Sequence, residues 1–120
     1  MTAKEVIDGA LERLGYNQSD TPAKRGLNAL NDVYAEVFYT EHWQGEAFRP
    51  VKKLTEILDI SQFAAFNCII YGVAAALALS ENDCDNQNYY AQIYNDKLRQ
   101  LPKRTPTRID ANPTPEGADI

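Results

Sequence analysis

Residues 63–79 form an apolar run rich in alanine, interrupted only by Asn67 and Gly72. A helix that is apolar on nearly all sides belongs at the centre of a bundle. Ser61 is a good N-cap residue, so we predict a central helix over 62–80. Its small residues let other helices approach closely, and its bulk comes from Phe63, Phe66, Ile69, Ile70, Val73 and Leu77.

A membrane span is the alternative interpretation of this run. Its 17 residues lie at the lower limit for crossing a bilayer. No Lys or Arg flanks the run, although such cations are typical beside a spanning helix. The first residues, MTAKEVIDG, lack the apolar core of a signal peptide. We therefore favour a buried core helix and expect no membrane partner.

The start of the chain predicts an amphipathic helix over 3–14. Thr2 and Glu5 have the spacing of a capping box, and Gly15 is a natural C-terminal stop. The apolar stripe of this helix comprises Val6, Ile7, Ala10, Leu11 and Leu14.

Two more helices complete the prediction. One opens with Pro22 at its first position, where the missing N–H costs nothing, and it ends between residues 39 and 43. The other covers about 86–100, with Asp83 or Asp85 as its N-cap. Its expected inner stripe comprises Tyr90, Ile93, Tyr94, Leu98 and Leu101.

The segment 44–60 differs from the helices around it. Gly45 and Pro50 break helical continuity, and the apolar residues keep no single period. The segment is a short hairpin, a loop with a helical turn, or an extended arm. It is too apolar to be a free linker, so it packs on its own domain or on a neighbouring copy. Its cations are Arg49, Lys52 and Lys53.

Together these patterns predict an all-α fold: about four helices in a small bundle, with an extended or hairpin segment between the second and third helices. The chain of 120 residues is long enough for one domain with its own core. We place this domain at residues 1–101. The remainder, 102–120, contains several prolines and one large aliphatic residue, Ile109, before its last position. We expect it to be a flexible tail.

Side chains that could carry chemistry are few. His42 is the only histidine, and with Glu41 and Glu46 it makes too small a ligand set for a metal, so we interpret it as a surface or interface residue. Cys68 is expected to be a buried small hydrophobe. Cys84 has no neighbouring cation that would stabilise a thiolate.

No catalytic motif is present in the sequence. Asp8 with Glu12, and Asp32 with Glu36, are paired carboxylates at helical spacing. Such pairs act as acid and base only in a cleft that shifts one pKa, and we favour the usual explanation, a solvated helix face. We therefore expect neither an enzyme nor a cofactor.

Aromatic and basic residues in the last third of the chain leave two partners open. Tyr89, Tyr90 and Tyr94 could stack on nucleobases, but we favour packing on the third helix with their hydroxyls at the rim. The basic stretch after them suits nucleic acid or an acidic protein surface. The formal net charge of −5 argues against nucleic acid as the main partner. This stretch comprises Lys97, Arg99, Lys103, Arg104 and Arg108.

The pattern over most of residues 1–101 resembles the phage head–tail connector (adaptor) family. The similar features are Phe48-x-Pro50 before the Leu58-Asp59-Ile60 turn, the small-residue pattern Tyr71-Gly72-x-Ala74-Ala75-x-Leu77-Ala78, an Asn- and Asp-rich turn, and Tyr90-x-x-x-Tyr94-Asn95-x-x-Leu98. The N-terminal helix ending in Leu14-Gly15 is also similar.

The resemblance implies a structural protein without catalysis. Copies would form a ring in the virion neck of a tailed phage, with the portal and the tail or stopper proteins as neighbours and DNA only passing through. The protein would be made in the cytoplasm of the bacterial host. The middle segment and the tail would reach adjacent proteins, and the expected interface residues are Phe48, Arg49, Val51, Lys52, Lys53, Lys103, Arg104 and Arg108.

We expect the cations of the middle segment to meet acids such as Asp32, Glu36 or Glu41 of the next copy. Two other functions stay open. The first is a small helical DNA-binding or DNA-packaging adaptor that uses the basic C-terminal stretch. The second is an accessory subunit of an enzyme.

Overall fold

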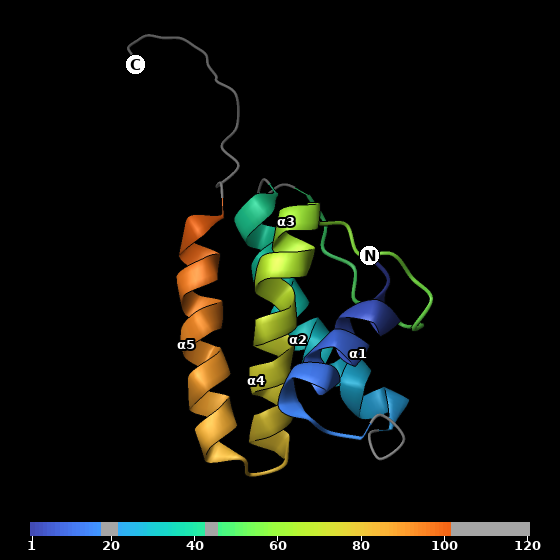
Figure 1. The fold of residues 1–120 in the computed structure, drawn as a ribbon. Helices are drawn as coiled ribbons and strands as arrows, with labels where there is room; N and C mark the ends of the chain where they lie inside the picture. Colours follow the sequence, from blue (N-terminus) through green and yellow to red (C-terminus); the bar gives the residue numbers. More distant parts are fainter. Residues whose placement is uncertain (18–21, 43–45, 102–120) are drawn as a thin grey trace, which may run out of the picture.

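The apolar run of the sequence is one continuous helix, Gln62–Ser80, in the computed structural model. It consists of α3 (Gln62–Ala64), a π-helical stretch η2 (Ala65–Ile69) and α4 (Ile70–Ser80). The other helices are α1 (Ala3–Leu14), α2 (Ala23–Glu41) and α5 (Cys84–Gln100), as Figure 1 shows. The structure describes residues 1–17, 22–42 and 46–101. The predicted all-α fold of four helices is confirmed, and no strand occurs within these ranges.

The long helix lies at the centre, as predicted. Helix α4 packs against α1, α2 and α5, and α5 runs back along it after a short turn (Figure 1). By length and composition Gln62–Ser80 could cross a membrane, the one helix of the described chain that could. Within the fold, 61% of its most apolar 18-residue stretch is buried, as in the core helix of a globular domain.

Local capping sets the helix ends. Thr2 and Glu5 form the predicted capping box, and Gly15 ends α1 in the left-handed conformation, with φ of 73°. The hydroxyl of Ser61 accepts the N–H of Ala64 at 3.1 Å, and Asp83 is the N-cap of α5. Helix α1 has the predicted bounds. Helix α5 begins two residues before its predicted start, and Pro22 is the N-cap of α2 instead of its first helical residue.

Three aromatic side chains are more exposed than predicted. Phe63 and Phe66 were expected in the core but are 44% and 52% exposed. Phe63 precedes η2 and Phe66 lies within it. A π-helical stretch has more residues per turn than the α-helix, so these two side chains are out of register with the inner face of α4. Tyr89 was expected to pack on the central helix and is 59% exposed, in edge contact with Tyr90.

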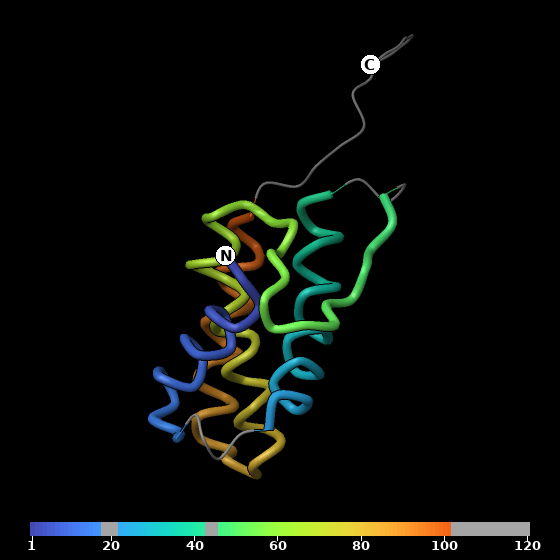
Figure 2. The backbone as a smooth tube through the Cα atoms, turned by 90° about the vertical axis from the view of Figure 1, so that its right-hand side faces the viewer, coloured from blue at the N-terminus to red at the C-terminus, as the bar shows by residue number. Residues whose placement is uncertain are grey.

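The segment 46–60 packs on its own domain and follows an irregular path. Figure 2 shows it running beside α2 and close to the N-terminus of the chain. The N–H groups of Ala3 and Lys4 donate to the carbonyls of Glu56 and Leu54, both at 2.9 Å. These donors have no partner inside α1, so the segment supplies acceptors that the first turn of this helix lacks. The predicted tail lies outside the described residues.

Candidate functional site

Three cations stand on the outer side of the middle segment. We call Arg49, Lys52 and Lys53 the cationic strip. All three residues are exposed, and none forms an ion pair with a carboxylate of the described residues. By contrast, Lys4 is paired with Asp8 on α1. The strip is therefore positive charge that the described part of this domain does not neutralise.

The backbone beneath the strip is held by α2. The side-chain oxygen of Asn31 accepts the N–H of Val51 at 2.7 Å, and its amide group donates to the Val51 carbonyl at 2.9 Å. Asn31 thus satisfies both polar groups of one buried residue. Asn31 was not predicted as a site residue, because an asparagine on a helix gives no local sign of a partner twenty positions away.

A carboxylate fixes the turn that carries the two lysines. Glu56 accepts the backbone N–H groups of Lys52 and Lys53 at 3.2 and 3.1 Å, and its own N–H donates to the Lys53 carbonyl at 3.2 Å. Because this carboxylate binds backbone groups, the ammonium groups keep their outward position. Glu56 is a second positioning residue that the sequence analysis missed.

The apolar members of the predicted interface point inward. Val51 is 5% exposed and belongs to the core of its own domain, so its side chain has no surface to offer a partner. Phe48 is half-buried, and its ring lies 5.1 Å from that of Tyr34 and 5.5 Å from that of Phe38. The aromatic residues of α2 pack against Phe48 and Val51 is buried in the core, which leaves the cations as the exposed part of the predicted set that the structure describes.

His42 is a correction to the sequence analysis. It was expected at the surface or at an interface, but it is 9% exposed and its ring stacks on Phe38 at 4.0 Å. It follows directly after Glu41, which is equally buried and accepts the N–H and hydroxyl of Ser61 at 2.8 and 2.5 Å. Glu41 therefore joins α2 to the start of α3, and its carboxylate is not available to another copy.

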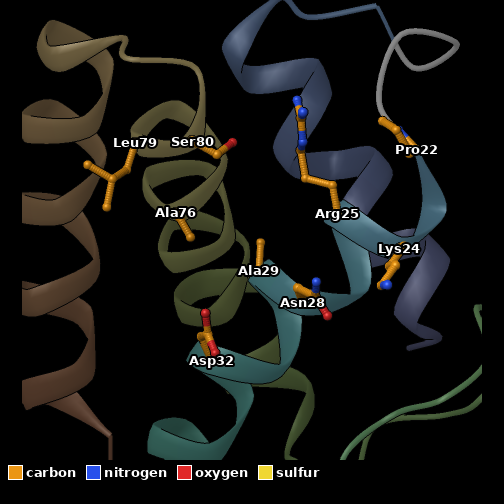
Figure 3. Close-up of a pocket in the computed structure, with 9 residues that line it drawn as sticks. All are labelled: Pro22, Lys24, Arg25, Asn28, Ala29, Asp32, Ala76, Leu79 and Ser80. Carbon is orange, nitrogen blue, oxygen red and sulfur yellow. The ribbon is translucent and has the colours of Figure 1, made fainter.

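A second surface feature is a groove of about 500 Å³ between the start of α2 and the end of α4 (Figure 3). Arg25 forms an ion pair with Glu81 beside it. The groove needs two helices to form, so no local sequence signal could have predicted it. It brings no nucleophile together with a base. Its lining comprises Pro22, Lys24, Arg25, Asn28, Ala29, Asp32, Ala76, Leu79 and Ser80.

Elsewhere in the described residues, the Cys84 thiol is exposed, whereas Cys68 and Tyr94 are buried. Burial raises the pKa of the Cys68 thiol to about 12, so this thiol stays protonated at neutral pH. The Tyr94 hydroxyl donates to Glu36 at 2.5 Å, and burial is the first cause of its raised pKa. No group of three potential metal ligands occurs among the residues that the structure describes.

The site therefore consists of a fixed backbone that presents cations, an arrangement suited to binding acidic groups. The remaining predicted interface residues, Lys103, Arg104 and Arg108, lie outside the described residues. The comparisons with known proteins add no relative: no family model, no curated protein and no solved structure matches this chain.

Proposed function

We propose that this protein is a structural head–tail connector (adaptor) subunit in the neck of a tailed phage or prophage, where copies assemble into a ring that joins portal to tail. The sequence resemblance over residues 1–101 supports this proposal, and so does the four-helix fold with an irregular segment between α2 and α3. The observation that carries it is the cationic strip, held outward on a backbone bonded from both sides.

The order of the strip's backbone favours assembly. Asn31 and Glu56 fix the turn that bears the lysines, and the first turn of α1 fixes the stretch after it. A surface that is already ordered loses less conformational entropy on binding than a flexible one. Repeated contacts around a ring need such a surface at every junction.

The partner of the strip is an acidic face of the next copy. Asp32 and Glu36 are exposed on α2, and the chain as a whole carries a formal net charge of −5. A cationic patch that meets an anionic one on another copy gives a head-to-tail contact, which closes into a ring when the rotation between neighbours allows it. Such charge complementarity also fixes the register of the contact.

The test is the double substitution Lys52→Glu with Lys53→Glu. Like-charge contacts at an interface cost several kcal/mol, so we expect ring or neck assembly to be lost while the helical circular dichroism stays unchanged. Assembly is followed by light scattering and by particle imaging, in the presence of portal protein because copies of an adaptor can stay monomeric without it.

The control is Lys24→Glu, which reverses one charge at the start of α2, outside the strip and outside the basic C-terminal stretch. Lys24 has no ion-pair partner among the described residues. Assembly of this control together with failure of the strip variant supports the proposal. Normal assembly of the strip variant would show that the strip is not part of the interface. Salt-dependent DNA binding by a monomer or dimer would favour the DNA-binding alternative.

A further inference from the structure

His42 lies where α2 ends and the strip-bearing segment begins, and it contacts that segment at both of its ends. The ring stacks on Phe38 of α2, with an interplanar angle of 16°. Its Nδ1 is 3.2 Å from a carboxylate oxygen of Glu46, and its Nε2 is 2.7 Å from the backbone carbonyl of Asp59. The side chain of the α2 C-cap thus contacts two points of the chain thirteen positions apart.

Both partners of the ring can only accept a hydrogen bond. A backbone carbonyl has no hydrogen, and neither has an ionised carboxylate. A neutral imidazole carries a single N–H, whereas the imidazolium carries two. The observed contacts are both satisfied when the two ring nitrogens each carry hydrogen. In a neutral ring that keeps the shorter bond to Asp59, Nδ1 presents a lone pair to the Glu46 carboxylate, and the two repel.

Other charged and titratable groups also lie around the ring. The carboxylate of Asp59 approaches Nε2 at 3.8 Å. Glu41, the last residue of α2, precedes His42 in the chain, and its carboxylate is bonded to Ser61. The hydroxyl of Tyr34 accepts the N–H of Asp59 at 2.8 Å. The carboxylates near the ring are thus Glu46, Asp59 and Glu41.

We propose that His42 and Glu46 form a proton-dependent tie that regulates the order of the chain at Phe48 and Arg49, where the cationic strip begins. The tie is closed when both ring nitrogens carry hydrogen, and it opens when the ring loses one of the two. Opening frees the chain next to Phe48 and Arg49. The consequence for ring assembly rests on the proposed function, whereas the tie itself does not.

The far part of the segment provides an internal reference. The N–H of Val51 donates to Asn31, and the N–H of Leu58 donates to the Met1 carbonyl at 3.0 Å. Neither bond involves the histidine. Proton loss from His42 should therefore loosen residues 47–49 and leave the backbone at Val51 and Leu58 ordered.

The experiment is NMR on the full-length chain from pH 5.5 to 8, with backbone order and amide protection read at each residue and the His42 ring nitrogens followed directly. Amide protection is corrected for the intrinsic base catalysis of exchange. The N–H of Phe48 donates to the Tyr39 hydroxyl at 3.4 Å. We expect amide protection at Phe48 and backbone order at Arg49 to decrease as the ring loses its proton, the protection several-fold, with Val51 and Leu58 constant. An unchanged Phe48 and Arg49 across the titration would overturn the proposal.

Two variants identify the partner of the second proton. Glu46→Gln places an amide beside Nδ1, and an amide can accept from an N–H or donate to a bare nitrogen, so the pH dependence at Phe48 and Arg49 should disappear. Asp59→Asn keeps the backbone carbonyl that Nε2 contacts, so the dependence should remain. Persistence of the dependence in Glu46→Gln, or its loss in Asp59→Asn alone, would refute the tie.

Assembly gives a separate readout. If the proposed function holds, wild-type rings form more readily at pH 6 than at pH 8, and rings of Glu46→Gln form equally at both. Rings with no pH preference would remove the regulatory role. Because the NMR readout uses the isolated chain, its failure leaves the connector proposal standing, and failure of the Lys52 and Lys53 substitutions to block assembly leaves the tie standing.

Discussion

Gly72 shows how one residue sets the spacing of the bundle. A Cβ atom at this position would lie 2.5 Å from a methyl carbon of Val33 on α2 and 2.8 Å from the ring of Tyr94 on α5. Real Cβ atoms do not approach that closely. The absent side chain therefore lets α2 and α5 both contact the central helix at the same level.

Gly72→Ala should lower the free energy of unfolding by about 1–3 kcal/mol, because the extra methyl group forces packed side chains apart. The matched control is Gly9→Ala on α1, where a Cβ would meet its nearest neighbours at an ordinary 3.5 Å. Removing a glycine from a helix interior usually stabilises it, by about 0.5–1 kcal/mol. Urea unfolding of the two variants measures the change in the free energy of unfolding for each. Equal changes would mean that Gly72 is not a point of close contact.

Among the elements, the segment 46–60 depends most on contacts distant in sequence. Its carbonyls complete the first turn of α1, Asn31 of α2 satisfies Val51, and Tyr34 accepts the N–H of Asp59. It lacks a regular hydrogen-bonded ladder apart from one bridge between Thr2 and Ile57. Its conformation is therefore set by side chains and helix ends that surround it.

Asn31→Ala should destabilise the protein by about 1–3 kcal/mol, since it leaves the buried N–H and carbonyl of Val51 without partners. Amide exchange at Val51 should accelerate more than exchange in α4. The control is Asn28→Ala on the same helix, because Asn28 is exposed and should change stability by less than about 0.5 kcal/mol. A similar loss in both variants would show that helix content, and not the bond to Val51, is responsible.

At the scale of the whole molecule, the helices share one core. Every helix contributes buried residues to one cluster, which extends to Leu101 at 3% exposure. The four helices of the described residues are therefore packed together around this cluster.

Cutting the chain after Leu101 should leave the fold intact and change the free energy of unfolding by less than about 1 kcal/mol. Thermal and urea unfolding of the shortened chain against the full chain measure this. The same cut should abolish docking to the neighbouring neck protein, if the tail is the arm that the connector proposal requires. A larger loss of stability would mean that the tail packs on its own domain, and docking with unchanged affinity would exclude it as the arm.

The sequence by itself determined where the helices lie. Capping groups such as Thr2, Ser61 and Asp83 bond to backbone groups within three residues. The period of the apolar residues identifies the inner face of each helix. Both features can therefore be recognised in the local sequence alone. The central position of residues 62–80 followed equally well, because a helix apolar on nearly all sides is stable only when other helices cover it.

Only the tertiary structure decided which side chains of these elements are used. The π-helical stretch exposes Phe63 and Phe66, the aromatic cluster on α2 takes Phe48 inward, and His42 is buried by a segment that returns to it from residues 46–59. Each of these outcomes depends on contacts between residues distant in sequence. Such contacts outweigh the conformational preferences of the local sequence. The sequence therefore pointed to the exposed cations of the candidate site, but not to the residues that hold their backbone.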